Sequence, residues 1–207
     1  SEGLTAPGQI GLIKEIYLSE GWVSEKGIRK KCQQCFRGMA QVTFVLIDAK
    51  NLETVKEMKK EIRALFKVGN HSVHINDYHV DTVRIAKTVF NDNSIHFLNK
   101  RRDVLFPNYK KLMSGKKPDN NTIITGSTVL SLYGLRDCKD VDLIYLNNPP
   151  VDSHNQYLGN LYKLTLDAIF NNPKYHLYYN GLQYVSLDVI KNMKKIRNEP
   201  KDVIDVK

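Results

Sequence analysis

The sequence has few of the features that mark secreted or membrane proteins. It holds three cysteines and one tryptophan among 207 residues, and an odd cysteine count is not typical of a disulfide scaffold. Its apolar runs are strand-length, well short of the roughly 20 residues needed to cross a bilayer. Residues 1–8 lack the basic and apolar regions of a signal peptide. We therefore expect a cytoplasmic protein without a membrane span.

One cysteine pair, Cys32 and Cys35, has the spacing of a metal or redox motif. The sequence has no second pair of this kind, and further zinc ligands close by would have to come from His71, His74 and His79. A structural or incidental role is the favoured interpretation, with zinc binding and redox chemistry as alternatives. Arg29, Lys30 and Lys31 would lower the thiol pKa values if the cysteines were exposed.

Acidic residues are fewer than basic ones: the chain has 22 Asp and Glu against 31 Lys and Arg, which gives a formal net charge of +9. The excess is spread over both halves of the chain. It favours anionic partners, either nucleic acid or a phosphate-bearing ligand, although solubility accounts for it nearly as well. The abundance of Asn, Lys, Ile and Tyr is typical of an AT-rich bacterial or viral genome. The chain ends inside an apolar pattern, Val203–Val206, so we expect a longer polypeptide.

Turn and breaker residues gather at Met113–Asn121 and predict a boundary between two domains, residues 1–113 and 121–207. The first domain has an α/β pattern and no identifiable role. We expect a buried strand at 41–48, an amphipathic helix at 53–66, a short strand at 72–75 and a helix that Asn76 and Asp77 cap. The fold class is therefore α/β or α+β.

The second half holds the residues that point to chemistry. Asn121–Thr125 predicts a strand, Gly126 and Ser127 follow it, and a short buried helix closes at Gly134. A second strand begins at Asp140 and Asp142, whose side chains would share one face and attract a hard cation. A phosphate contact beside an acid pair is typical of phosphoryl or nucleotidyl transfer. A plain turn and a solvated strand edge are the bland alternatives.

Gly126-Ser127, twelve further residues and then Asp140-Val141-Asp142 resemble the signature of minimal nucleotidyltransferases of the polymerase-β-like superfamily. The segment from Thr125 to Arg136 resembles the branch of bacterial toxin and antitoxin proteins. Downstream, residues 181–191 and 199–205 resemble the strand, helix and Lys-Asp turn that close such domains. The resemblance covers residues 121–207 and implies a mixed sheet with flanking helices.

The resemblance implies a transfer of a nucleoside monophosphate from an NTP to a hydroxyl, with release of pyrophosphate. Asp140 and Asp142 would hold catalytic Mg²⁺ or Mn²⁺. Phosphate contacts are expected at Gly126, Ser127, Lys191 and Lys201. Solvated positions on one helix face are the competing interpretation for Lys191, Lys194 and Lys195. The acceptor and the preferred base stay open.

The sequence departs from the family at one point. A third carboxylate is expected on a later strand, yet 176–179 and 182–185 contain none, and Asp188 falls in the next helix. One alternative is therefore a catalytically degenerate module that binds nucleotide, RNA or a protein partner. Another is a metal-dependent glycosyltransferase that uses Asp140-Val141-Asp142 to bind a sugar nucleotide.

Overall fold

The computed structural model describes residues 3–18, 20, 24–38 and 41–207. It is a mixed α/β fold, as the sequence predicts, with a four-stranded sheet. None of the helices in these ranges is long and apolar enough to cross a membrane. The helices are α1 (Ala6–Ile16), α2 (Glu25–Phe36), α3 (Leu52–Phe66), α4 (His79–Val89), α5 (Asp92–Lys100), α6 (Pro107–Met113), α7 (Ser127–Leu132), α8 (Leu166–Asn171), α9 (Leu187–Arg197) and α10 (Pro200–Asp205).

All four strands of the sheet come from the second half of the chain. Its order is β2-β1-β4-β3, where β1 is Thr122–Thr125, β2 Asp142–Tyr145, β3 His176–Tyr179 and β4 Leu182–Val185. The outer pairs are antiparallel, and β1 runs parallel to β4 with Ile124 opposite Tyr184. Short one-turn helices join the remaining segments at Gly69–His71 (η1), His154–Tyr157 (η2), Leu158–Tyr162 (η3) and Pro173–Tyr175 (η4).

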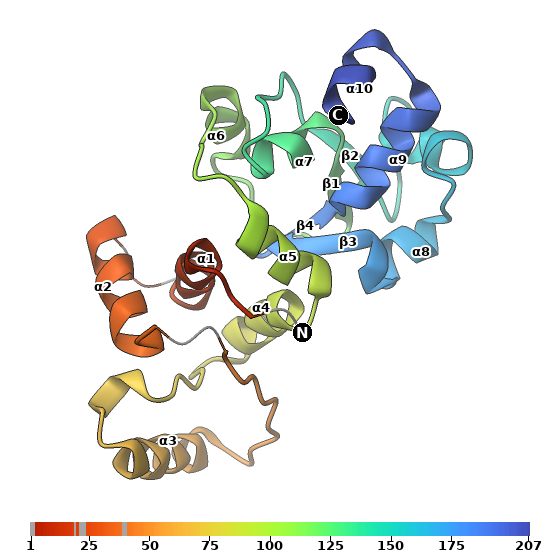
Figure 1. The fold of residues 1–207 in the computed structure, drawn as a ribbon. Coiled ribbons are helices and arrows are strands. Elements are labelled where there is room, and N and C mark those ends of the chain that lie inside the picture. Colours follow the sequence, from red (N-terminus) through yellow and green to blue (C-terminus); the bar gives the residue numbers. More distant parts are fainter. Residues whose placement is uncertain (1–2, 19, 21–23, 39–40) are drawn as a thin grey trace.

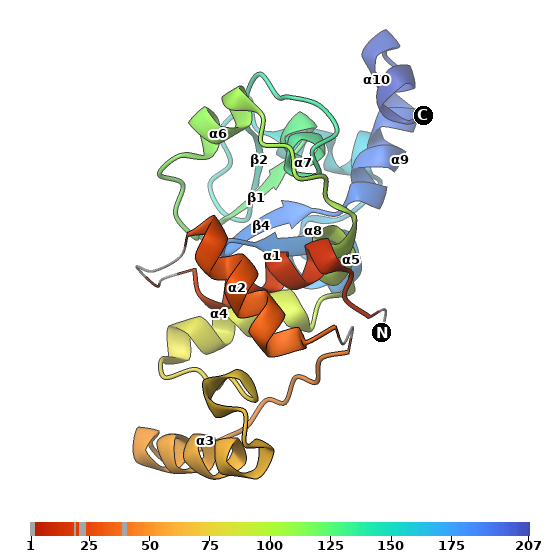
Figure 2. The same ribbon diagram turned by 60° about the vertical axis from the view of Figure 1, so that its left-hand side comes forward.

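The sheet lies between two groups of helices. Helices α1, α4 and α5 lie on one side, and α7 and α9 on the other (Figures 1 and 2). Helix α5 contacts β3 directly, and α1 packs across α5. The hydrophobic core is continuous over both halves of the chain, since Phe97 of α5 packs on Tyr133 and Tyr179 with ring centroids 5.0 and 4.9 Å apart.

Side chains close both free edges of the sheet. On the β2 edge, the Asn155 amide donates to the carbonyl of Tyr145 at 2.7 Å and accepts from its N–H at 2.8 Å. On the β3 edge, Asn91 donates to the carbonyl of His176 at 3.1 Å, and Ser94 accepts from the amide of Tyr178 at 2.8 Å. These side chains take the place of a neighbouring strand.

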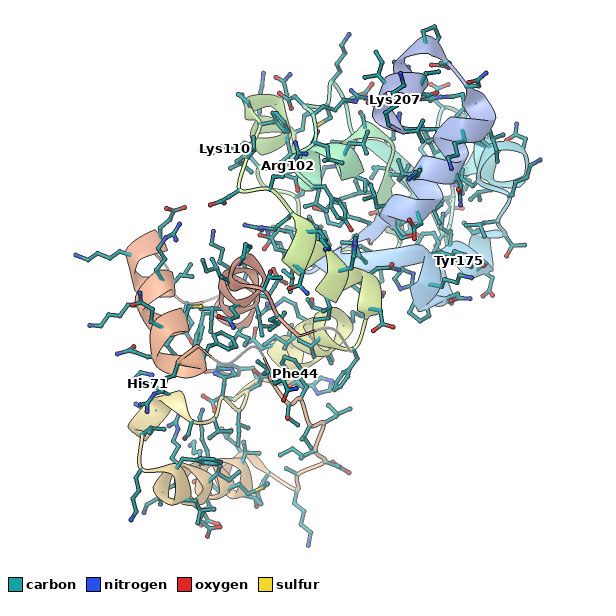
Figure 3. The ribbon with its side chains drawn as sticks, in the orientation of Figure 1. Phe44, His71, Arg102, Lys110, Tyr175 and Lys207 are labelled. Carbon is teal, nitrogen blue, oxygen red and sulfur yellow. The ribbon has the colours of Figure 1, made fainter. Side chains whose placement is uncertain are left out.

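The first half departs from the expected α/β pattern, because its described residues form helices without a strand. Residues 41–48 are irregular and their apolar side chains face solvent, with Val45 74% and Leu46 67% exposed. Phe44 alone of this run packs against the core (Figure 3). The strand expected at 72–75 is also irregular. Both predictions are wrong, because neither apolar run finds a strand with which to pair.

Both predicted helices form, but the cap expected from Asn76 and Asp77 does not. Helix α3 matches the predicted helix 53–66 and buries none of its residues. Asn51 caps its start, with a side chain that accepts from the amide of Thr54 at 2.9 Å. It lies far from the sheet in both views (Figures 1 and 2). Helix α4 starts after Tyr78 without a side-chain cap, because Asp77 pairs with Lys59 at 3.2 Å instead.

Candidate functional site

The ends of β1 and β2 bring Gly126 and Asp142 into direct contact. Thr125 and Asp142 face each other across the antiparallel pair, and Gly126 follows with φ of 65° and ψ of −144°. A Cβ at this glycine would overlap Oδ2 of Asp142 and lie 2.8 Å from its Cγ. Only glycine therefore permits this carboxylate to lie against the backbone at the start of α7. Ser127 is the next residue and begins that helix.

A chain of hydrogen bonds holds the Asp142 side chain from the other side. Oδ1 of Asp142 lies 3.1 Å from Nε2 of His154, and Nδ1 of His154 lies 2.7 Å from the hydroxyl of Tyr162. The Tyr162 hydroxyl in turn bonds Oγ1 of Thr125 at 2.8 Å. The chain begins and ends on paired strands, so it fixes the carboxylate, the imidazole and the phenol together.

The electrostatics favour an anionic Asp142. Burial is the largest single influence and acts to raise its pKa. The hydrogen bond and charge of His154, with the positive charges of Arg197 and Lys194, outweigh burial, so the pKa of Asp142 lies below its usual value. Burial also raises the pKa of the Tyr162 phenol. The site therefore presents a carboxylate beside a neutral phenol near neutral pH.

Asp140 occupies a different environment from the one expected. The strand predicted to start at Asp140 begins at Asp142, and Asp140 lies exposed in the preceding bend. Its carbonyl accepts a hydrogen bond from Oγ1 of Thr128 at 3.0 Å, which ties the start of α7 to this segment. Strand alternation therefore does not govern its side chain, and the prediction that the strand begins at Asp140 is wrong.

The lysines expected at phosphate lie on the surface of the closing helices. Lys191 is exposed on α9, and Lys201 on α10 pairs with Glu199 at 2.9 Å. Lys194 is the buried one, only 2% exposed, with its Nζ 2.8 Å from carboxylate oxygens of both Asp202 and Asp205. The interpretation of Lys194 as part of a solvated face is therefore wrong.

Arg197 completes this arrangement at the end of α9. It donates from Nε and from an Nη atom to the two carboxylate oxygens of Asp202, each at 2.8 Å. Arg197 and Lys194 are also the cations whose charges act on Asp142. Sequence reasoning missed His154, Tyr162 and Arg197 as parts of the site, since none belongs to the quoted motif. They come together in the folded chain from short helices and a helix end, whose positions in space the periodicity of the sequence does not predict.

The donors available for a cation are two carboxylates. Strands β3 and β4 carry no acid, and Asp188 lies exposed in the first turn of α9. No group of three or more His, Cys, Asp or Glu within the described ranges could hold a metal ion. Mg²⁺ keeps several waters and binds nucleotides through one or two carboxylates plus phosphate oxygens, so the ionised carboxylate of Asp142 fits an ion delivered with a nucleotide.

The cysteine pair lies away from this site, on α2. Cys32 is buried and Cys35 partly buried, and both are free thiols. Burial raises the pKa of each thiol, and the nearby Lys31 does not offset it at Cys35. Neither cysteine therefore has the exposed, basic surroundings that would create a reactive thiolate.

Comparison of the chain with protein-family models, with curated proteins and with solved structures finds no match.

Proposed function

We propose that the chain is a nucleotidyltransferase-like protein that binds an NTP with Mg²⁺ or Mn²⁺ and transfers its NMP to a hydroxyl acceptor. The contact between Gly126 and the Asp142 carboxylate carries this proposal. It places a backbone segment free of side chain beside an ionised acid at one edge of the sheet. A phosphate that approaches Gly126 would meet any cation that the acid holds.

Each residue of the site has its own role in binding the nucleotide and its metal ion. Gly126 carries no side chain, the Asp142 carboxylate lies where its Cβ would be, and Ser127 offers a hydroxyl beside them to a phosphate oxygen. Asp140 and Asp142 would hold the divalent ion, which neutralises phosphate charge when bound. His154 and Tyr162 keep the Asp142 side chain oriented and ionised before any ligand arrives. This preorganisation avoids the cost of ordering the carboxylate on binding.

A nucleotide-binding module without transferase activity is the second candidate. The later strands on which the resemblance predicts a third acid, residues 176–179 and 182–185, carry none, and the neighbour of the Asp142 carboxylate is His154. The imidazole does not add the negative charge that a third metal ligand would supply. The same site would then bind nucleotide and leave the acceptor untouched. The glycosyltransferase alternative gains no support from the Gly126 contact, and a UDP-sugar tests it directly.

The test is a thermal-shift panel of ATP, GTP, CTP, UTP and UDP-sugars, each with and without Mg²⁺ or Mn²⁺. A ligand at 100 times its Kd adds about 2.7 kcal/mol. That gain raises the Tm of a chain this size by roughly 5–10 °C. We expect an NTP to produce a metal-dependent shift that Asp142→Asn abolishes, whereas Asp152→Asn, an exposed acid outside the site, keeps it.

Two outcomes would contradict the proposal. If an NTP raises the Tm of Asp142→Asn as much as that of the parent chain, Asp142 is not part of the nucleotide site. A larger shift with a UDP-sugar than with any NTP would favour the glycosyltransferase. Incubation with an α-labelled NTP then separates transfer from binding, since only an active site moves the labelled NMP to an acceptor and releases unlabelled pyrophosphate.

A further inference from the structure

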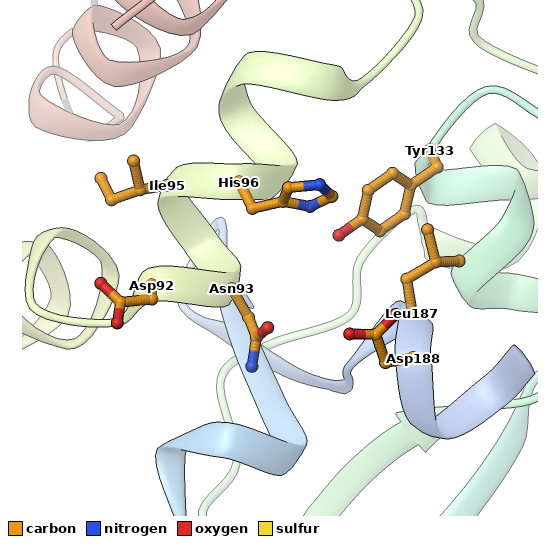
Figure 4. Close-up of a pocket in the computed structure, with 7 residues that line it drawn as sticks. All are labelled: Asp92, Asn93, Ile95, His96, Tyr133, Leu187 and Asp188. Atoms are coloured by element: carbon orange, nitrogen blue, oxygen red, sulfur yellow. The ribbon is translucent and has the colours of Figure 1, made fainter. Parts of the chain in front are cut away.

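A polar groove lies between the starts of α5 and α9. Its larger part, a cavity of about 470 Å³, has Asp92 and His96 on one wall and Tyr133 and Asp188 on the other (Figure 4). A second cavity of about 420 Å³ shares Asp92 and Asp188 and continues to Ser186. The two cavities therefore form one groove along the edge of the sheet.

Ser186 lines the second cavity, and its side chain is almost fully buried. It precedes α9 at the capping position and is 1% exposed, yet its side chain does not cap the helix. Its buried Oγ makes no hydrogen bond within the described part of the chain. A buried hydroxyl without a partner costs free energy, so a ligand oxygen that reached it would be stabilised. The first amides of α9 likewise lack a side-chain acceptor.

The charges around the groove select the kind of ligand. The carboxylates of Asp92 and Asp188 repel an anion such as phosphate. The N-termini of α5 and α9 carry partial positive charge, and Lys174 adds a full one, so a cation is also disfavoured. What remains favourable is a neutral ligand that both donates and accepts hydrogen bonds. A polyhydroxylated molecule meets this requirement.

The remaining lining suits the ring of a sugar. Leu187 offers an apolar contact for its C–H faces, and Tyr133 offers both a ring and a hydroxyl, whereas the side chain of Ile95 points away from them (Figure 4). His96 lies beside Tyr133, with ring centroids 6.3 Å apart. Carboxylates, a hydroxyl and an aromatic ring thus alternate with aliphatic groups over one groove.

The groove and the Gly126 site lie at the same end of the sheet, where strands β1 and β4 finish. Gly126 follows β1 and Ser186 follows β4, and these strands are parallel neighbours through Ile124 and Tyr184. Adjacent strands lie about 4.8 Å apart, so the two strand ends lie next to each other. A ligand in the groove is therefore close to the place where the nucleotide is proposed to bind.

We infer that this groove binds a neutral saccharide, one hydroxyl of which is the acceptor of the nucleotidyl group. The acceptor role rests on the proposed function, whereas saccharide binding does not. In the transfer, the sugar hydroxyl oxygen forms a bond to the α-phosphorus, and the bond from that phosphorus to the β-bridging oxygen breaks. Pyrophosphate leaves with the electron pair, and the hydroxyl proton passes to solvent.

The experiment is ligand-observed NMR on the full chain without nucleotide. The probes are glucose, galactose, mannose, N-acetylglucosamine, maltose and lactose, with spermidine and inorganic phosphate as cation and anion. We expect at least one saccharide to bind, with Kd raised tenfold or more by Asp188→Ala and by Ser186→Ala. Asp103→Ala removes a carboxylate that is 79% exposed outside the groove and is expected to leave Kd unchanged.

The outcomes separate this inference from the nucleotide proposal. No saccharide binding, stronger binding of spermidine or phosphate, or a Kd unchanged in both groove variants would overturn it. Asp142→Asn is expected to keep saccharide binding while losing the NTP shift. If saccharides bind and no NTP does, saccharide binding by the groove is confirmed, whereas the acceptor role and the proposed function are both contradicted.

Discussion

At the scale of single residues, Gly126 shows how a backbone conformation sets the site. Its φ of 65° with ψ of −144° lies where side-chain-bearing residues are strained, and the Asp142 carboxylate fills the space of a Cβ. We predict that Gly126→Ala lowers the free energy of unfolding by about 3 kcal/mol, from backbone strain and displacement of Asp142. Urea denaturation measures the change.

Gly159 provides the matched control for this substitution. A Cβ there would meet no atom within 4 Å, and its φ is not positive. Gly159→Ala is expected to change the free energy of unfolding by less than about 0.5 kcal/mol. A Gly126→Ala chain as stable as the Gly159→Ala chain would mean that Asp142 does not lie against the glycine.

Glu15 is a second residue whose environment has a measurable consequence. It is fully buried in α1, where its carboxylate accepts from the amide of Asn180 at 2.9 and 3.1 Å. Burial raises its pKa to about 7, against the lowering effects of the Asn180 amide and the charges of Arg84 and Arg101. Between pH 4.5 and 7 the folded chain therefore holds a proton that the unfolded chain has released.

This difference predicts how stability depends on pH. The contribution of Glu15 is complete below pH 4.5 and is lost as the pH rises to 7, by about 3 kcal/mol in total. Glu15→Gln does not ionise, so its free energy of unfolding should lack this decline. Urea denaturation of both chains at intervals from pH 4.5 to 8 tests the prediction, and parallel curves would contradict it.

At the scale of elements, a buried ion cluster joins α9 to α10. Lys194 contacts Asp202 and Asp205 at 2.8 Å, and all three side chains are nearly inaccessible. Removal of one partner from a buried ion pair leaves an uncompensated charge. We predict that Lys194→Ala lowers the free energy of unfolding by about 3 kcal/mol. The exposed Lys195 is the control, with an expected change in Lys195→Ala below about 0.5 kcal/mol.

Denaturant midpoints test this prediction, and a second measurement locates the effect. Hydrogen exchange should show lost protection in α10, because its Asp202 and Asp205 lose their shared lysine. Unchanged protection in α10 would show that Arg136 and Arg197 hold the helix without Lys194.

The elements also show what sequence patterns can and cannot predict. β1, α7 and the Gly134 turn follow from local signals, since a β-branched run and a glycine of positive φ (72°) act over a few residues. The run at 41–48 has the same β-branched composition and forms no strand. Strand formation needs a partner, and the pairing of strands is decided by the whole fold.

In the candidate site, too, some residues could be predicted from the sequence and others could not. Gly126 and Asp142 are recognisable from their spacing, because one helix and one turn separate them. His154 and Tyr162 lie in irregular segments whose course no periodicity fixes, and Lys194 is buried only because α10 folds back on α9. The motif residues were thus predictable, while the residues that orient them were not.

At the scale of the whole molecule, the first half of the chain covers the sheet that the second half builds. Phe97 and Leu98 of α5 are fully buried, and the hydroxyls of Tyr109 and Tyr184 lie 3.3 Å apart across the predicted domain boundary. We predict that a fragment of residues 118–207 lacks a cooperative thermal transition, because the face of β3 and β4 under α5 loses its cover. Near-UV circular dichroism during heating measures this, with the full chain as control. A sharp melt of the fragment would show that residues 121–207 fold independently.

The closed edges of the sheet have a consequence for how this molecule meets others. Asn155 hydrogen-bonds the outward N–H and carbonyl of Tyr145 on β2. On β3, Asn91 hydrogen-bonds the carbonyl of His176, and Ser94 hydrogen-bonds the N–H of Tyr178. An incoming extended peptide therefore finds these backbone groups already engaged and gains little by lying alongside either edge.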